Sequence, residues 1–188
     1  LLIVALPIVD LLTRPTPRRD ARLALANRYY SYAVARKDPA AFRAWWENYL
    51  DQWSLMGGQV FTGDPSGVLP FRLKPNSQGL LFESRIEINS KGFRGKEFPD
   101  DKGNFYRIVA LGESSTFGCT LNAADRPWPE VLEEVIRGQI KLGRPVQVIN
   151  AGVPAYSLKH NLHRLISDIL PLKPDLIISY HGFNGFRL

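Results

Sequence analysis

Cysteine is almost absent from this sequence, and the shortage narrows the classes of protein that fit. Cys119 is the single cysteine among 188 residues, so no intrachain disulfide can stabilise the fold. It directly follows Gly118, where a small buried filler is the favoured interpretation. The chain also has no G-x-G-x-x-G and no G-x-x-x-x-G-K-[ST] motif, which argues against a dinucleotide fingerprint and against a P-loop.

The composition is that of a globular protein without a nucleic-acid signature. Hydrophobic residues make up 45% of the chain and charged residues 22%, which suits the core of one domain. The net charge is +6, but part of the excess is local, in Arg14, Arg18, Arg19 and Arg22. Because such a run is usually a solvated or lipid-facing surface, we predict no nucleic-acid partner.

The first residues indicate a membrane segment. The opening LLIVALPIVDLL, residues 1–12, is shorter than the about 20 apolar residues of a membrane helix. We interpret it as the remnant of a transmembrane or signal-anchor segment, with an amphipathic or buried terminal helix as the alternative. Residues 13–56 are predicted to be a helical juxtamembrane region, with Asp38 and Pro39 as N-cap and first-turn pair. An aromatic stripe at helical spacing predicts a face that docks on the domain or at a membrane interface: Phe42, Trp45, Tyr49 and Trp53.

The rest of the chain predicts an α/β domain after a β-rich lead-in. Residues 57–104 hold turn clusters and short runs, among them the alternating Ser84 to Ile88, typical of irregular β structure. Within residues 105–188 the apolar runs YRIVALG, PVQVINAG and DLIISYHG alternate with amphipathic helices, which predicts a parallel sheet covered on both faces. The predicted apolar arcs are Val131, Leu132, Val135, Ile136 and Ile140 in the first helix, and Leu158, Leu162, Leu165, Ile166 and Ile169 in the second.

Glycine and small polar residues follow all three predicted strands, in the loops GESSTFG, NAGVPAYS and HGFNG. Because open parallel sheets bind ligands beyond the carboxyl ends of their strands, we expect these loops to form one site. Ser114 lies at a strand-to-helix turn, where backbone N–H groups can face an anion. Gly152 lets its N–H approach an oxyanion, and Asn184 adds a side-chain donor. Together they suit the nucleophile and the oxyanion hole of an acyl-transfer site.

In this order the three loops resemble the first three sequence blocks of the SGNH (GDSL-type) hydrolases, over about residues 70–188. The resemblance implies a three-layer, flavodoxin-like α/β fold, here incomplete and preceded by N-terminal helices and the β-rich lead-in. It also implies hydrolysis of O-acyl esters of a glycan, a lipid or a small molecule, with no cofactor and no metal. The roles it implies are Ser114 as nucleophile and backbone donor, the Gly152 N–H and the Asn184 side chain as further oxyanion donors, and Glu113, Ser115 and His181 in support.

The stretch before the first block bears on location. FRLKPNSQG…INSKGFRGKEF is similar to the lead-in of membrane-anchored members of that superfamily. This similarity favours a protein anchored in the membrane through its N-terminal segment, with the domain outside the cytoplasm. The basic flank TRPTPRR favours the cytoplasmic side instead. We expect the extracytoplasmic arrangement.

The sequence departs from the family pattern where the general base should be. Glu113 stands where the family usually has an Asp before the serine, and Gly185 stands where the family commonly has an Asp after the asparagine. Both positions are supporting ones. No Asp is followed by a His three residues later, so the family's Asp-x-x-His block is not in this chain. His181 would have to lie within about 3 Å of the nucleophile to act as its base, and a pocket-lining or core role is favoured. His160 and His163 are interpreted as part of a solvated helix face rather than as a metal pair.

Two other classes of function stay open at this stage. A flavodoxin-like phosphate or cofactor binder would explain the first loop but not Gly152 or Asn184. A non-catalytic, glycan-binding envelope module would suit the missing Asp-x-x-His. Because a sheet of three strands would leave an apolar edge uncovered, we expect a fragment that is inactive alone, from an esterase whose base lies further along the chain.

Overall fold

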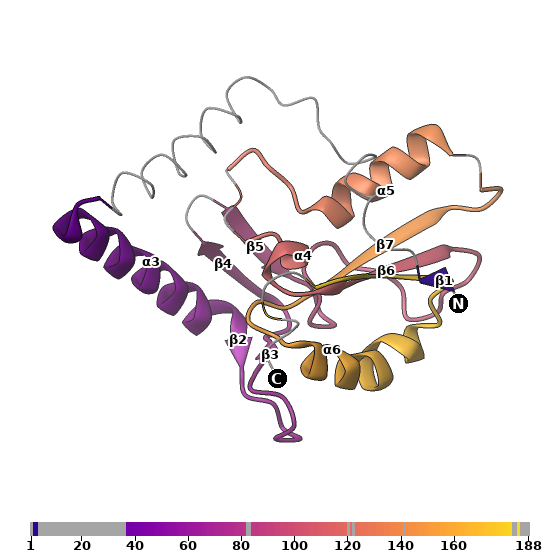
Figure 1. Cartoon of the computed structure of the whole chain (residues 1–188). Coiled ribbons are helices and arrows are strands. Elements are labelled where there is room, and N and C mark those ends of the chain that lie inside the picture. The colour runs from indigo at the N-terminus through magenta and orange to yellow at the C-terminus, as the bar shows by residue number, and fades with distance from the viewer. Residues whose placement is uncertain are drawn as a thin grey trace.

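The computed structural model describes residues 2–3, 37–81, 84–119, 121, 123–140, 142–181 and 184. Its centre is a parallel sheet in the strand order β1-β8-β6-β7. Helices lie on both sides of this sheet, and a lead-in built from one long helix and four short strands lies beside it (Figure 1).

The order of the three main strands is that of a flavodoxin-like fold. β6 (Tyr106–Gly112) lies in the middle, with β7 (Val146–Gly152) on one side and β8 (Leu176–Tyr180) on the other. Both neighbours pair with β6 in parallel, so that Gly112 is level with Gly152 and with Tyr180. Along the chain, β6 is the first of the three strands, β7 the second and β8 the third. Their order in the sheet is therefore 2-1-3, which is how the flavodoxin-like order begins. The predicted α/β fold class is therefore confirmed, as an incomplete sheet. At two positions the outer edge of β8 is paired in parallel by β1 (Leu2–Ile3).

The alternation of side chains along β6 divides the core into two layers. Ile108 faces α5 (Trp128–Gln139) and packs with Leu132 and Ile136 of that helix. Val109 points to the other face, where it packs in a cluster that includes Ile169. That face is covered by α6 (Leu158–Arg164), the π-helical turn η1 (Leu165–Ile169) and the 3₁₀ turn η2 (Leu170–Leu172). The three layers are thus helix, sheet and helix, as the period-2 pattern requires.

The predicted apolar arc of the second helix is wrong for three of its five members. Leu158, Leu162 and Ile166 are 50%, 56% and 64% exposed, whereas Ile169 is buried and Leu165 packs on the core. Two polar residues occupy the inward face in their place. Asn161 donates to Gly112 O at 3.3 Å, and Arg164 donates to Ala151 O at 2.6 Å. These carbonyls at the ends of β6 and β7 need donors, so hydrogen bonding outweighs apolar burial on this face.

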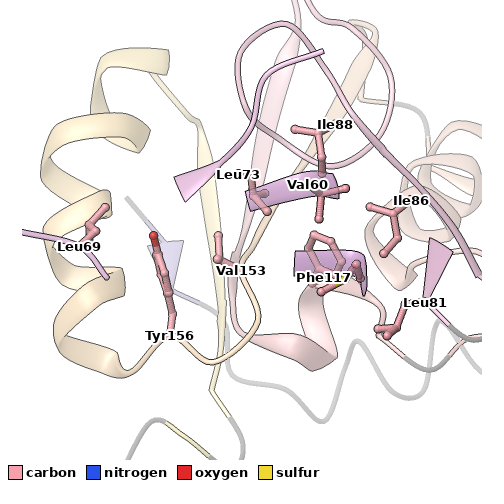
Figure 2. Close-up of a cluster of buried hydrophobic side chains, with 10 residues drawn as sticks. Val60, Leu69, Leu73, Leu81, Ile86, Ile88, Phe117, Val153 and Tyr156 are labelled. Atoms are coloured by element: carbon pink, nitrogen blue, oxygen red, sulfur yellow. The ribbon is translucent and has the colours of Figure 1, made fainter. Parts of the chain in front are cut away.

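The lead-in packs on the sheet domain through its own apolar cluster. It consists of α3 (Pro39–Val60), β2 (Phe61–Thr62), β3 (Arg72–Leu73), β4 (Ser77–Leu81) and β5 (Ser84–Ile88). The strand predicted at residues 84–88 is confirmed, with alternate side chains buried. Figure 2 shows lead-in side chains such as Val60 and Ile86 around Phe117 of the sheet domain. An ion pair adds to this contact, since Arg72 of β3 lies 3.0 Å from Asp168 of η1.

The N-terminal predictions fall partly outside the described residues. Asp38 accepts a hydrogen bond from the Ala40 N–H at 2.9 Å, as an N-cap residue does. Trp53, the last residue of the aromatic stripe, packs against the lead-in cluster, while the side chains of Phe42 and Trp45 are not described. Of the proposed membrane segment only Leu2 and Ile3 are described, and they form β1. Among the described residues, no helix is long and apolar enough to cross a bilayer.

Candidate active site

The first loop turns sharply from β6 into a single helical turn, α4 (Ser114–Phe117). Gly112 makes this turn sterically feasible, because a Cβ there would lie 2.2 Å from Thr116 Oγ1 and 2.3 Å from Tyr180 O. Ser114 is the first residue of α4 and is half-buried, whereas Ser115 is exposed. No hydrogen bond is made by the Ser114 hydroxyl within the described part of the chain. Ser114 thus stands at the carboxyl end of the central strand, as predicted.

The third loop is tied directly to the first. The Asn184 N–H donates to Glu113 Oε2 at 2.8 Å. Glu113 is only 1% exposed, and within the described part of the chain its other oxygen, Oε1, is buried without a hydrogen-bond partner. A buried carboxylate gains from such a bond, because an unpaired one is costly. Glu113 therefore holds the residue that carries the predicted oxyanion amide next to the residue that carries the predicted nucleophile.

The second loop begins at Gly152, the last residue of β7. Its N–H donates to Asn150 Oδ1 at 3.0 Å and is therefore already in use. The glycine serves packing instead, since a Cβ there would lie 2.2 Å from Phe117 N in α4. Ala155, three residues further on, is exposed and has a left-handed backbone with φ 62°. Its N–H has no partner in the described part of the chain. A non-glycine residue in this region is uncommon and marks positions under functional or structural constraint.

His181 lies in the same cluster but does not contact Ser114. Its Nδ1 is 3.5 Å from Asn161 Nδ2, and its buried Nε2 has no hydrogen-bond partner among the described residues. Burial lowers the pKa of His181, while the charge of Glu113 acts in the opposite direction. The contact with Asn161, which also donates to Gly112 O, fits the pocket-lining role better than that of base.

The other two histidines lie on α6, and both are half-buried. His160 Nδ1 accepts the Ser157 N–H at 3.1 Å and so completes the N-terminal cap of the helix. Within the described part of the chain, no group of three or more His, Cys, Asp or Glu residues is arranged to hold a metal ion.

A cavity of about 560 Å³ lies below the second loop, between α6 and the lead-in. Val153 and Tyr156 of that loop line it, as do charged residues, but Ser114 does not. The charges compensate one another: Arg164 lies 3.2 Å from Asp168, which also pairs with Arg72 of β3. This hollow is therefore a salt-bridged contact between the lead-in and α6 rather than part of the cluster around Ser114.

Comparison with known proteins gives partial similarities. No protein-family model and no curated protein matches the chain. Among solved structures, AlinE4, an esterase of the SGNH-hydrolase family, is 31% identical with a TM-score of 0.36, over 45% of this chain and 43% of that one. A lipase/acylhydrolase from Enterococcus faecalis is 31% identical with a TM-score of 0.34, over 40% of this chain and 38% of that one.

Over part of its length, the chain is therefore similar to an esterase of the SGNH-hydrolase family and to a lipase/acylhydrolase. It spans less than half of either structure.

Proposed function

We propose that this chain forms the nucleophile and the oxyanion hole of a serine ester hydrolase. The observation that carries the proposal is the hydrogen bond from the Asn184 N–H to Glu113, which links two loops 71 residues apart in sequence. A serine and a carboxamide residue, each following one of two paired parallel strands, would supply the nucleophile and part of the oxyanion hole of an acyl-transfer site. A phosphate or cofactor site would use the first loop alone.

The proposed mechanism begins with attack of Ser114 Oγ on the carbonyl carbon of an ester. The carbonyl oxygen becomes an oxyanion and accepts hydrogen bonds from the Ser114 N–H and from the Asn184 side chain. The third donor in this proposal is the Ala155 N–H, in place of the Gly152 N–H that Asn150 already binds. Collapse of the tetrahedral intermediate expels the alcohol, and water then hydrolyses the acyl-serine.

The proton of Ser114 needs a base. The SGNH resemblance implies the histidine of an Asp-x-x-His block, which this chain does not contain. Of the described histidines, none forms a hydrogen bond with Ser114. We therefore expect the isolated chain to be inactive, or nearly so, and the base to come from outside the chain described here.

The substrate and the location follow from the same resemblance. We expect an O-acyl ester of a glycan, a lipid or a small molecule, and a domain held at the outer side of the cytoplasmic membrane by the N-terminal segment. Fusion of a periplasmic reporter and a cytoplasmic reporter to the domain would distinguish the two sides of the membrane.

The test of the proposal is covalent labelling of the protein expressed from its complete coding sequence. A fluorophosphonate probe should label that protein, and should fail to label Ser114→Ala. Ser54→Ala is the matched control, because that exposed hydroxyl lies in α3, outside the three site loops, and should leave labelling unchanged. Equal labelling of wild type and Ser114→Ala would remove Ser114 as the nucleophile. If wild type is not labelled and instead retains glycan on an affinity column, the non-catalytic module would be the better description.

A further inference from the structure

The turn that carries Ser114 is too short to hold its own conformation. α4 spans only Ser114–Phe117, and an isolated turn is unfavourable because nucleation fixes several dihedral angles for one hydrogen bond. It is closed by the Phe117 N–H to Glu113 O at 2.8 Å and by the Gly118 N–H to Ser114 O at 2.9 Å. Its last carbonyls have no helical partner and need donors from elsewhere.

Arg94, from the lead-in, supplies those donors. Its Nη1 donates to Phe117 O at 2.7 Å and to Gly118 O at 2.9 Å. Its guanidinium carbon lies 4.7 Å from the centroid of the Phe117 ring. One cation thus binds both carbonyls at the negative end of the turn and stacks on the side chain between them.

The other side of the same guanidinium is anchored in the lead-in. Nη2 donates to Ser84 Oγ at 3.1 Å and to Arg85 O at 3.2 Å, both in β5. Arg94 also forms an isolated antiparallel bridge with Asn150, the residue whose side chain binds the Gly152 N–H. Arg94 therefore contacts the first two site loops and the lead-in at once.

Burial of this cation is costly, and no carboxylate offsets the cost directly. Arg94 is 5% exposed, and no salt bridge to it is found among the described residues. Burial lowers its pKa, against the weaker effects of Cys119 and Glu130. Because an unpaired buried charge must be hydrogen-bonded, the four oxygens around it are what keep it in place.

We propose that Arg94 is a positioning residue that sets the orientation of Ser114 by binding the far end of α4. The inference rests on the proposed function, in which Ser114 is the nucleophile. It assigns the lead-in a part in the reaction: β5 and Arg94 form the support against which the nucleophile turn is held.

Arg107 is a matched control for this role. It is a buried arginine, 0% exposed, and it donates to Leu172 O at 2.8 Å, to Pro99 O at 3.0 Å and to Gln147 Oε1 at 2.6 Å. It is the second residue of β6, so it lies at the end of the strand opposite to the site. A lysine at either position keeps the charge and loses the forked geometry.

The experiment compares Arg94→Lys with Arg107→Lys in the protein expressed from its complete coding sequence. Both should lower the melting temperature. Only Arg94→Lys should lower kcat and the rate of fluorophosphonate labelling, by about 10- to 100-fold with a nearly constant KM, because a shift of about 1 Å at the nucleophile is enough for such a loss. Equal kcat in the two variants would overturn the proposal.

Amide hydrogen exchange provides a readout that does not depend on activity. In Arg94→Lys the peptide covering residues 113–119 should exchange faster than in wild type, whereas in Arg107→Lys it should not. If Arg94→Lys does not fold, Ser84→Ala replaces it, since it removes one anchor of the guanidinium; unchanged exchange and unchanged kcat in that variant would also refute the role. Absence of labelling at Ser114 in wild type would instead refute the proposed function, and exchange would still decide whether Arg94 holds α4.

Discussion

Replacing Gly152 by alanine tests how closely α4 must approach β7. A Cβ at this position would lie 2.2 Å from Phe117 N, 2.7 Å from Thr116 C and 2.8 Å from Phe117 Cα. All three atoms belong to backbone, so no side-chain rotation can relieve the clash. Ordinary contacts begin near 3.4 Å, and the helical turn and the strand would therefore have to separate by about 1 Å.

Two effects of Gly152→Ala are expected from that displacement. Overpacking of this kind costs about 1–3 kcal/mol of unfolding free energy, which for a chain of this size lowers the melting temperature by roughly 2–12 °C. Because Ser114 moves with α4, the rate of fluorophosphonate labelling should fall about 100-fold. Thermal unfolding followed by circular dichroism, and labelling followed over time, measure the two effects separately.

The matched control is Gly138→Ala, in α5. A Cβ there would meet no atom within 4 Å, and the site is an exposed helical position. Alanine should therefore stabilise the protein by about 0.8–1 kcal/mol through helix propensity, with an unchanged labelling rate. Wild-type stability and labelling in Gly152→Ala would show that α4 does not need this close contact, and the packing account of Gly152 would be wrong.

Three further predictions concern titratable side chains. Burial raises the pKa of the Cys119 thiol to about 12, so at pH 8 it should react with a disulfide reagent about 1,000-fold more slowly than in the urea-unfolded chain; equal rates would contradict this. The Tyr156 hydroxyl donates to Phe71 O. Tyr156→Phe should lower the free energy of unfolding in urea by about 1–3 kcal/mol, because the acceptor is left unpaired. An unchanged urea midpoint would speak against that bond. Burial lowers the pKa of His181 from its ordinary value of 6.5, so the unfolded state binds a proton more readily and stability should fall as the pH drops below about 6.5. This fall should be smaller in His181→Gln. An identical dependence of stability on pH in the two proteins would mean that His181 is not buried in its neutral form.

The parallel sheet between two helical layers could be predicted because β6 and β7 are buried on both faces. YRIVALG and PVQVINAG do not alternate regularly between polar and apolar residues. This lack of alternation is expected of strands between two helical layers, whereas strands of a half-exposed sheet alternate. The alternation of Ser84 to Ile88 was equally direct, since β5 buries every second side chain. Such a pattern of polar and apolar residues is visible in each segment by itself, without knowledge of the residues that it contacts.

The inward face of α6 was not predictable by the same reasoning. Its apolar residues form an arc, yet Asn161 and Arg164 are the buried ones. Their partners, Gly112 O and Ala151 O, lie 49 and 13 residues away. The capacity of a carbonyl at the end of a strand to accept such a bond leaves no trace in the residue type, so hydrophobic periodicity alone assigns the wrong face.

The same limit applies to the glycine at the end of β7. A glycine at the end of a strand is compatible with two demands, close approach of a ligand and close approach of another backbone segment. At Gly152 the backbone of α4 makes the close approach. The Gly152 N–H, which a ligand would need, already donates to Asn150 Oδ1. Arg94 could not be found from the sequence for a related reason, because only the fold brings the carbonyls of Phe117 and Gly118 to its guanidinium. Donors that act on backbone atoms therefore have to be found from the structure, while the serine and the asparagine at the strand ends could be found from the sequence.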